Sequence, residues 1–180
     1  MGHTAVSLWG FGCFPKIHPE SILELGCGGG KNVRRLLDRY PDASVTALDY
    51  SPLSVAETCR LNHKYMEDGR GQVLQGDVSD LPFPDECFEL ATAFETVYFW
   101  PGPAESFRQV HRVLKPEGRF IIVNESDGLN PRDQKWVSMI DGMKLYNKEQ
   151  LKNYLLEPGF SSVITRQDPK HHRLCLIADK

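Results

Sequence analysis

A glycine cluster close to the start of the chain constrains the fold more than any other feature. The short apolar run Ile22-Leu23-Glu24-Leu25 ends at once in Gly26-Cys27-Gly28-Gly29-Gly30, and an amphipathic segment follows from Asn32 to Tyr40. A strand, a tight turn and a helix start in this order predict the first crossover of a doubly wound α/β sheet. Glycine lets backbone approach a ligand closely, and the helix N-terminus behind it supplies unpaired N–H groups.

The spacing of the glycines separates three kinds of ligand site. A phosphate-binding loop would need a glycine where Leu25 stands and a hydroxyl residue where Asn32 stands. A dinucleotide fingerprint counted from Gly26 would need its third glycine at Lys31. Both patterns fail. The pattern that remains is Glu24-x-Gly26-x-Gly28-x-Gly30.

The rest of the chain alternates between strand and helix patterns. We expect further strands at 44–49, 72–76, 87–93, 119–124, 161–167 and 173–179, and helices at 51–68, 103–114 and 148–156. The last two strands are joined by Asp168-Pro169-Lys170, which is too short for a crossover, so they must be antiparallel. The prediction is an α/β fold with one doubly wound, largely parallel seven-stranded sheet ending in an antiparallel hairpin.

Composition indicates one soluble domain over residues 1–180, with residues 1–20 as a short N-terminal cover segment. The net charge of -3 favours no polyanionic partner, so we expect no nucleic-acid binding. No apolar run reaches membrane-spanning length, and the start of the chain lacks the basic residues of a secretory signal. Five scattered cysteines predict reduced thiols in a cytoplasmic protein. The histidines show no metal-ligand spacing, and His171-His172 is interpreted as a polar turn; we expect no metal.

Acidic residues follow two of the predicted strands. Ligands of open α/β sheets bind beyond the carboxyl ends of the strands, so Asp49 is placed to accept hydrogen bonds from both hydroxyls of a ribose. The alternative is that Asp49 helps Ser51 to cap the next helix. Asp77, after Gly76, is a second candidate, and its alternative is an Asx turn at the strand end.

An aromatic segment, 94–100, follows the fourth predicted strand. Exposing aromatic rings to water at a strand end is unfavourable, so these rings should line or cover a pocket. Glu95, Tyr98 and Trp100 are the preferred pocket residues, whereas Phe99 is expected to pack against the following helix.

Two motifs resemble those of the class I S-adenosylmethionine-dependent methyltransferases. The first is Glu24-x-Gly26-x-Gly28-x-Gly30, and the second, residues 113–123, resembles the "RVLKPGG" signature of the small-molecule branch, with Glu117 replacing the first glycine. The resemblance covers residues 20–124 strongly. It implies S-adenosyl-L-methionine as cofactor, Asp77 bound to the adenine amino group and the next backbone N–H bound to a ring nitrogen. The cofactor residues that we predict on this basis are Trp9, Glu24, Gly26, Cys27, Gly28, Gly30, Asp49, Tyr50, Ser51, Gly76, Asp77, Val78, Phe94 and Glu95.

The resemblance further implies methyl transfer to a small-molecule acceptor, with Glu95 and Tyr98 as the candidate catalytic residues. A non-catalytic cofactor-binding module and a nucleotide-dependent oxidoreductase remain alternatives. Trp9 is expected either beside the ligand or in the core, and His3 in solvent. The short cover segment predicts either a chain trimmed from a longer one or a homodimer in which another subunit completes the site. Candidate acceptor-side residues are Asn124, Glu125, Trp136, Met139 and Met143.

Overall fold

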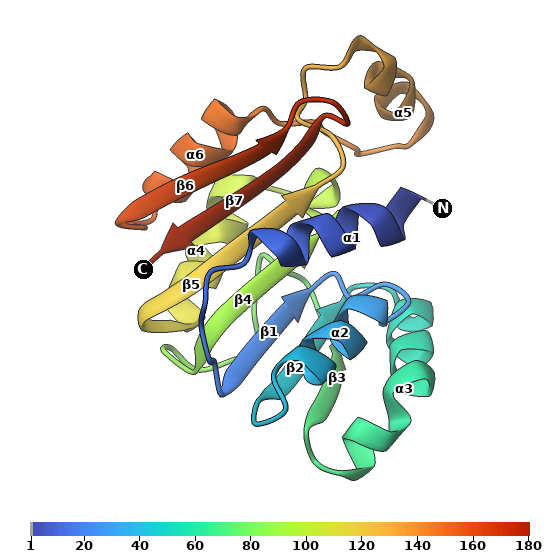
Figure 1. Ribbon diagram of the computed structural model, residues 1–180, viewed down its shortest axis with the longest axis vertical. Coiled ribbons are helices and arrows are strands. Elements are labelled where there is room, and N and C mark those ends of the chain that lie inside the picture. The colour runs from blue at the N-terminus through green and yellow to red at the C-terminus, as the bar shows by residue number, and fades with distance from the viewer. Residues whose placement is uncertain (1) are drawn as a thin grey trace.

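The computed structural model, which describes the backbone of residues 2–180 and the side chains of residues 4–180, contains a seven-stranded sheet (Figure 1). The strand order is β3-β2-β1-β4-β5-β7-β6, and β7 alone runs in the direction opposite to the other six strands. The strands are β1 (Ser21–Leu25), β2 (Ser44–Asp49), β3 (Gly71–Gln75), β4 (Phe88–Phe94), β5 (Leu114–Asn124), β6 (Ser162–Asp168) and β7 (Arg173–Asp179). The predicted largely parallel sheet with an antiparallel hairpin at its end is confirmed.

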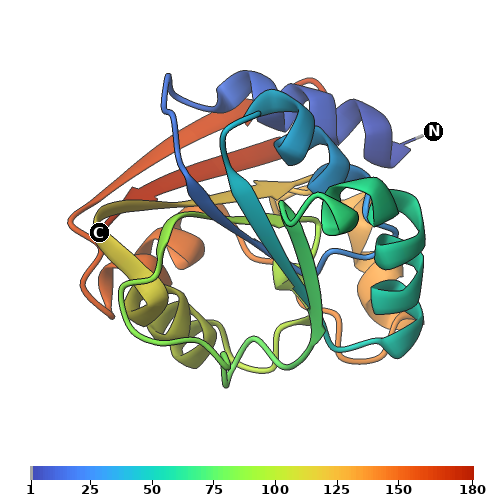
Figure 2. The ribbon, with the colours of Figure 1, turned by 90° about the horizontal axis from the view of Figure 1, so that it is seen from below.

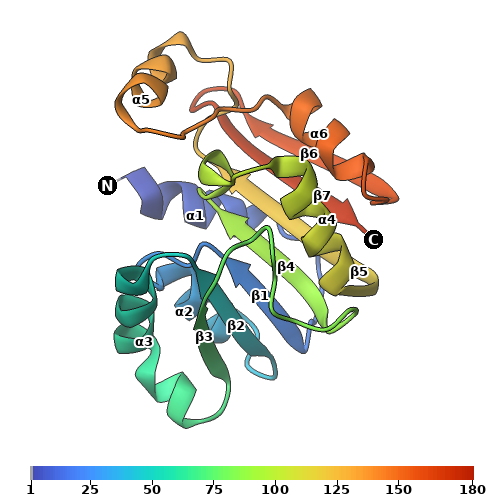
Figure 3. The same cartoon turned by 180° about the vertical axis from the view of Figure 1, so that it is seen from behind.

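Helices cover both faces of the sheet. Figure 1 shows α1 (Gly2–Cys13) and α2 (Lys31–Arg39) in front of it, and Figure 3 shows α4 (Pro103–Val113) and α6 (Lys148–Leu156) on the opposite face. Seen from below, the sheet separates these two layers, and α3 (Pro52–Glu67) packs against β3 beside α2 (Figure 2). The remaining short helices are η1 (Val97–Phe99), η2 (Pro131–Asp133) and α5 (Gln134–Met139).

Local sequence accounts for the helix starts. Ser51 caps α3 by accepting a hydrogen bond from the Ser54 N–H at 3.3 Å, with Pro52 in the first helical position. Asn147 caps α6 in a reciprocal capping box with Gln150. These signals explain why α3 and α6 begin within one residue of the predicted starts.

The N-terminal cover segment is the helix α1, which lies close to the sheet. A Cβ on Gly10 would be 2.6 Å from Val123 Cγ1 and 3.2 Å from Phe94 Cε1, so only glycine permits this approach. The rings of Phe11 and Phe94 stack at 4.8 Å between centroids. The helix α1 therefore belongs to the apolar layer that also contains α2.

Two segments differ from the expectation. Residues 115–118, which separate the predicted helix 103–114 from the predicted strand 119–124, form a turn inside β5, which begins at Leu114 paired with Phe88 and has an irregular register before Arg119. Glu117 in this turn has a φ of 64°, the left-handed conformation that glycine adopts most easily. The stretch after Glu125, where no strand or helix is predicted before 148, contains η2 and α5.

Candidate functional site

The carboxyl ends of β1, β2 and β3 surround a cavity of about 570 Å³. This volume lies within the range of small-molecule sites, roughly 300–1000 Å³. Parallel strands bring their carboxyl ends to one edge of the sheet, which is why residues far apart in the sequence meet here. We call this space the cofactor cavity.

The glycine turn forms one wall of the cofactor cavity. Gly26 and Gly28 both have positive φ angles, 75° and 52°. A Cβ on Gly26 would lie 2.4 Å from Thr96 Cγ2, whereas nothing lies within 4 Å of one on Gly28. The backbone at Gly28 is thus open to the cavity, and a ligand can approach it directly.

Asp49 joins this turn to the end of β2. Its Oδ2 accepts a hydrogen bond from the Gly28 N–H at 2.9 Å, and its Oδ1 accepts one from the Ser51 N–H at 3.0 Å. The side chain is 6% exposed and lines the cavity. Its contact with Ser51 agrees with the helix-start alternative, and its place in the cavity wall agrees with the ribose interpretation.

Asp77 lines the same cavity after the end of β3. Its Oδ1 accepts hydrogen bonds from the Ser79 N–H at 2.8 Å and from the Ser79 hydroxyl at 2.7 Å. The Asx turn considered from the sequence is therefore present. It holds one carboxylate oxygen and leaves the acid at the cavity wall.

Most of the predicted cofactor residues line this cavity. They are Gly26, Gly28, Asp49, Tyr50, Ser51, Gly76, Asp77, Val78 and Glu95. The cavity fits an adenosine linked to an amino acid. It offers a carboxylate beyond each of two neighbouring strands, an open glycine backbone, and apolar surface from Val78 and Trp100. These residues would hold S-adenosylmethionine through its ribose, its adenine and its methionine part.

Five predicted cofactor residues do not line the cavity. Glu24 is 1% exposed and accepts a hydrogen bond from Thr92 inside the sheet, where burial raises its pKa to about 8. Trp9 packs against the apolar cluster beneath α1 and α2. The other three make contacts within the protein. Cys27 Sγ accepts a hydrogen bond from Thr58, and the ring of Phe94 stacks on that of Phe11. Gly30 is the N-cap of α2, and its carbonyl accepts a hydrogen bond from Asn62. Direct contact of these five residues with a ligand stays a prediction.

The cofactor cavity also contains residues that the sequence did not indicate. They are Ser54, Thr96, Phe99, Pro101, Asp141 and Gly142. Thr96 closes over Gly26 and donates a hydrogen bond to the Leu25 carbonyl at 3.0 Å. Asp141 and Gly142 follow α5, and no strand end marks them in the sequence. An Asp-Gly turn signal was available, but it carries no information about which cavity the turn faces.

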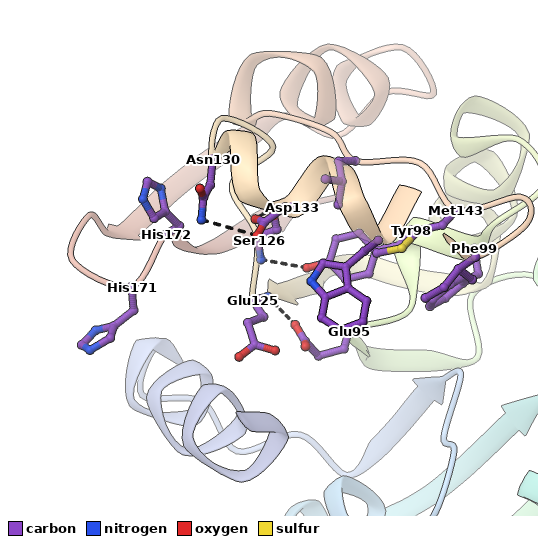
Figure 4. Close-up of a pocket in the computed structure, with 13 residues that line it drawn as sticks. Glu95, Tyr98, Phe99, Glu125, Ser126, Asn130, Asp133, Met143, His171 and His172 are labelled. Carbon is purple, nitrogen blue, oxygen red and sulfur yellow. Dashed lines mark hydrogen bonds between the residues drawn. The ribbon is translucent and has the colours of Figure 1, made fainter. Parts of the chain in front are cut away.

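A second cavity, of about 500 Å³, adjoins the first and shares Glu95 and Phe99 with it. Figure 4 shows its side chains, which come from the loop after β4, the segment after β5 and the β6–β7 turn. We call it the acceptor cavity. Its lining consists of Glu95, Tyr98, Phe99, Glu125, Ser126, Asn130, Asp133, Trp136, Ile140, Met143, Leu145, His171 and His172.

Glu95 lies where the two cavities meet. Its backbone has a φ of 64°, and its Oε1 accepts a hydrogen bond from the Glu125 N–H (Figure 4). Burial, and then the charge of Glu125, raises the pKa of Glu95 to about 8. Near neutral pH this carboxyl group can therefore both hold and release a proton.

Tyr98 forms the floor of the acceptor cavity. Its hydroxyl oxygen accepts a hydrogen bond from the Ser126 N–H at 3.0 Å, and its side chain is 5% exposed. Burial, with Glu95 nearby, raises the pKa of Tyr98 well above its ordinary value. The phenol therefore keeps its proton and cannot act as a base at neutral pH.

Several expectations for the acceptor side need correction. Phe99, expected to pack against the following helix, is 46% exposed and lines both cavities. His171 and His172 do form a turn, but both also line the acceptor cavity. Glu125, Trp136 and Met143 line it as expected, whereas Met139 is 71% exposed outside it and Asn124 is fully buried. The side chain of His3 lies outside the described residues.

Two further features concern the described residues as a whole. None of their helices combines the length and the apolar character needed to cross a membrane. Nor do they hold a group of three or more His, Cys, Asp and Glu side chains arranged to bind a metal ion.

Comparison with known proteins agrees with this geometry. A family model described as a methyltransferase domain matches residues 23–122. The chain is 28% identical over 149 residues to a malonyl-[acyl-carrier protein] O-methyltransferase from Halorhodospira halophila, a match covering 81% of this chain and 50% of the relative. The chain spans about half the length of several curated relatives that it matches.

Solved structures show the same fold. An S-adenosylmethionine-dependent methyltransferase from Mesorhizobium loti superposes with a TM-score of 0.78 at 19% identity, over 99% of this chain and 100% of the other. A chain from the Haloferax volcanii complex between the Trm112 methyltransferase activator and a methyltransferase gives a TM-score of 0.85 at 19% identity, covering 98% and 89%. The family model covers more than half of the chain, so the protein belongs to the methyltransferase domain family (Methyltransf_11), whose methyl donor is S-adenosylmethionine.

Proposed function

We propose that this chain transfers a methyl group from S-adenosylmethionine to a small-molecule acceptor. The observation that carries the proposal is a pair of adjoining cavities that share Glu95 and Phe99. One cavity is lined by residues suited to a nucleoside, and the other is not. A module that only binds the cofactor has no need of a second cavity at this position.

Asp49 and Asp77 are proposed to orient the nucleoside, and the backbone at Gly26 and Gly28 to contact the methionine part. When bound, S-adenosylmethionine supplies an electrophilic methyl carbon with a neutral thioether as leaving group. Little acid catalysis is needed for that leaving group, so the main task of the protein is to align the acceptor. Glu95 and Tyr98, which line the acceptor cavity beside the shared wall, are the residues that we propose for this task.

Calorimetry with the purified chain tests the cofactor part of the proposal. We expect S-adenosylmethionine and S-adenosylhomocysteine to bind at micromolar strength or better, and reduced nicotinamide dinucleotide much more weakly. The opposite ranking would favour the oxidoreductase alternative.

A metabolite screen tests the reaction. The chain is incubated with S-adenosylmethionine, and both S-adenosylhomocysteine and a product heavier by one methylene unit are read by mass spectrometry. Cofactor binding without turnover on any acceptor of suitable size would favour a binding module instead.

A further inference from the structure

The acceptor cavity is rich in carboxylates. Glu95, Glu125 and Asp133 line it, and no lysine or arginine is found among its described lining residues. Its two histidines are each hydrogen-bonded to an acid outside that lining, His171 to Asp168 at 2.7 Å and His172 to Asp127 at 3.2 Å. Charge complementarity therefore favours a cationic occupant, and an anionic one would meet repulsion.

The same cavity has an apolar wall that is partly exposed. Phe99, Trp136 and Ile140 are 46%, 44% and 38% exposed, and Met143 and Leu145 complete this wall. Large apolar side chains gathered around one cavity indicate a ligand that covers them. The Lys135 ammonium already lies 4.7 Å from the ring centroid of Trp136, so this ring enters the proposal only as apolar surface.

We propose that the acceptor is an amine with an apolar body, held as its ammonium form by Glu95, Glu125 and Asp133 and covered by Phe99, Trp136 and Ile140. This inference rests on the proposed methyl transfer and specifies its substrate class. It departs from the O-methyltransferase activity that the name of the relative from Halorhodospira halophila states for that protein.

An ammonium group has no lone pair, so it must lose a proton before it can react. Glu95 borders both cavities, and its ionised form, which a neighbouring ammonium group favours over the protonated one, can accept that proton. The nitrogen lone pair then forms the new N–C bond to the methyl carbon of S-adenosylmethionine. The electrons of the broken C–S bond stay on sulfur, which leaves as a neutral thioether, and the nitrogen carries the positive charge in the product.

Matched ligands test the charge preference directly. Binding is measured by calorimetry, with S-adenosylhomocysteine saturating, for three sets of equal apolar body: phenethylamine, phenethyl alcohol and hydrocinnamate; hexylamine, hexanol and heptanoate; tryptamine, tryptophol and indolepropionate. We expect the amine to bind tightest in the sets that fit, by about tenfold or more over the alcohol, and the carboxylate weakest. Equal binding of amine and alcohol, tighter binding of a carboxylate, or no amine binding in any set would overturn the proposal.

Variants that remove charge from the cavity test which residues cause the preference for an amine. Glu125→Gln together with Asp133→Asn should weaken amine binding about tenfold, because it removes two carboxylates at nearly constant shape. Binding of S-adenosylhomocysteine should not change, since neither residue lines the cofactor cavity, and binding of the uncharged alcohol should change much less than that of the amine. Glu117→Gln, an exposed change in the turn near the start of β5, is the control. An unchanged amine affinity in the double variant would contradict the assignment.

The two levels of the proposal fail in different ways. If S-adenosylhomocysteine does not bind the wild-type chain, the proposed function fails. If it binds normally while amines show no preference over alcohols, only the acceptor class is wrong.

Discussion

Glu24 is a carboxyl group enclosed by the sheet, and its protonation links stability to pH. Burial raises its pKa to about 8, with the hydrogen bond from Thr92 as a smaller opposing effect. Between roughly pH 5 and pH 8 the folded chain keeps this proton while the unfolded chain has released it. The free energy of unfolding therefore decreases as pH rises through that range.

Glu24→Gln should reduce this pH dependence, because a glutamine amide does not ionise. We expect the wild-type chain without cofactor to lose on the order of a few kcal/mol from pH 5 to pH 8, and the variant to lose clearly less. Urea unfolding at several pH values measures the difference. Glu95, whose pKa is also about 8, contributes in the same range, and Glu95→Gln isolates its share. The same slope in Glu24→Gln as in wild type would contradict the raised pKa of Glu24.

Asp49 carries both a structural and a proposed ligand-binding role. Although it faces the cofactor cavity, its two oxygens accept hydrogen bonds from the Gly28 and Ser51 N–H groups. Asp49→Ala would leave both donors unpaired, each costing about 1–3 kcal/mol. Asp49→Asn keeps the shape and one of the two acceptor oxygens, so it is the milder probe of ligand binding.

Asp49→Asn should weaken S-adenosylhomocysteine binding by about tenfold or more, because hydrogen bonds to an ionised acceptor are worth about 1.5–3 kcal/mol. Calorimetry measures the affinity, and urea unfolding shows whether the variant is folded. Asp42→Asn, an exposed aspartate in the turn before β2, serves as the matched control. An Asp49→Asn variant with normal affinity would restrict this residue to positioning the turn and the start of α3.

The glycine turn between β1 and α2 depends on close packing against the loop after β4. Gly26 combines a φ of 75° with a Cβ position 2.4 Å from Thr96 Cγ2. An alanine here is strained by its backbone conformation and also forces Thr96 to move. The two elements are thus fitted to each other at the edge of the cofactor cavity.

Gly26→Ala should lower the free energy of unfolding by about 2 kcal/mol or more and weaken S-adenosylhomocysteine binding as well. Gly12→Ala provides the contrast. Gly12 lies in α1 with nothing within 4 Å of its Cβ position, so alanine should stabilise that helix by up to about 1 kcal/mol. Thermal unfolding and calorimetry on both variants measure the two effects. A Gly26→Ala chain as stable as wild type would show that the turn adapts freely.

Apart from the start of β5, the strands and the main helices could be predicted from the sequence because their signals are local. Apolar runs, Ser51-Pro52 and the short 168–170 link each act within a few residues of one another. The cavities are different, because their walls depend on contacts between distant segments. No local pattern shows that Phe99 lines both cavities, that Gly30 lies against Asn62, or that Asp141 reaches the cofactor cavity.

The cofactor cavity draws its walls from segments between Gly26 and Gly142, so binding there should link distant parts of the molecule. At a hundred times Kd, a ligand specific for the folded chain stabilises it by about 2.7 kcal/mol. Amides that exchange only through global unfolding should then slow by up to about a hundredfold.

Hydrogen exchange measured by mass spectrometry with and without S-adenosylhomocysteine tests this linkage. Peptides covering 26–28, 99–101 and 141–142 should gain protection, because all three segments contribute to the cavity wall. The edge strand β6 lines neither cavity and exchanges by local fraying, so it serves as the internal control. Protection at 26–28 without any at 141–142 would remove Asp141 and Gly142 from the ligand site. The cofactor would then be held by the first half of the sheet and the loop after β4 alone.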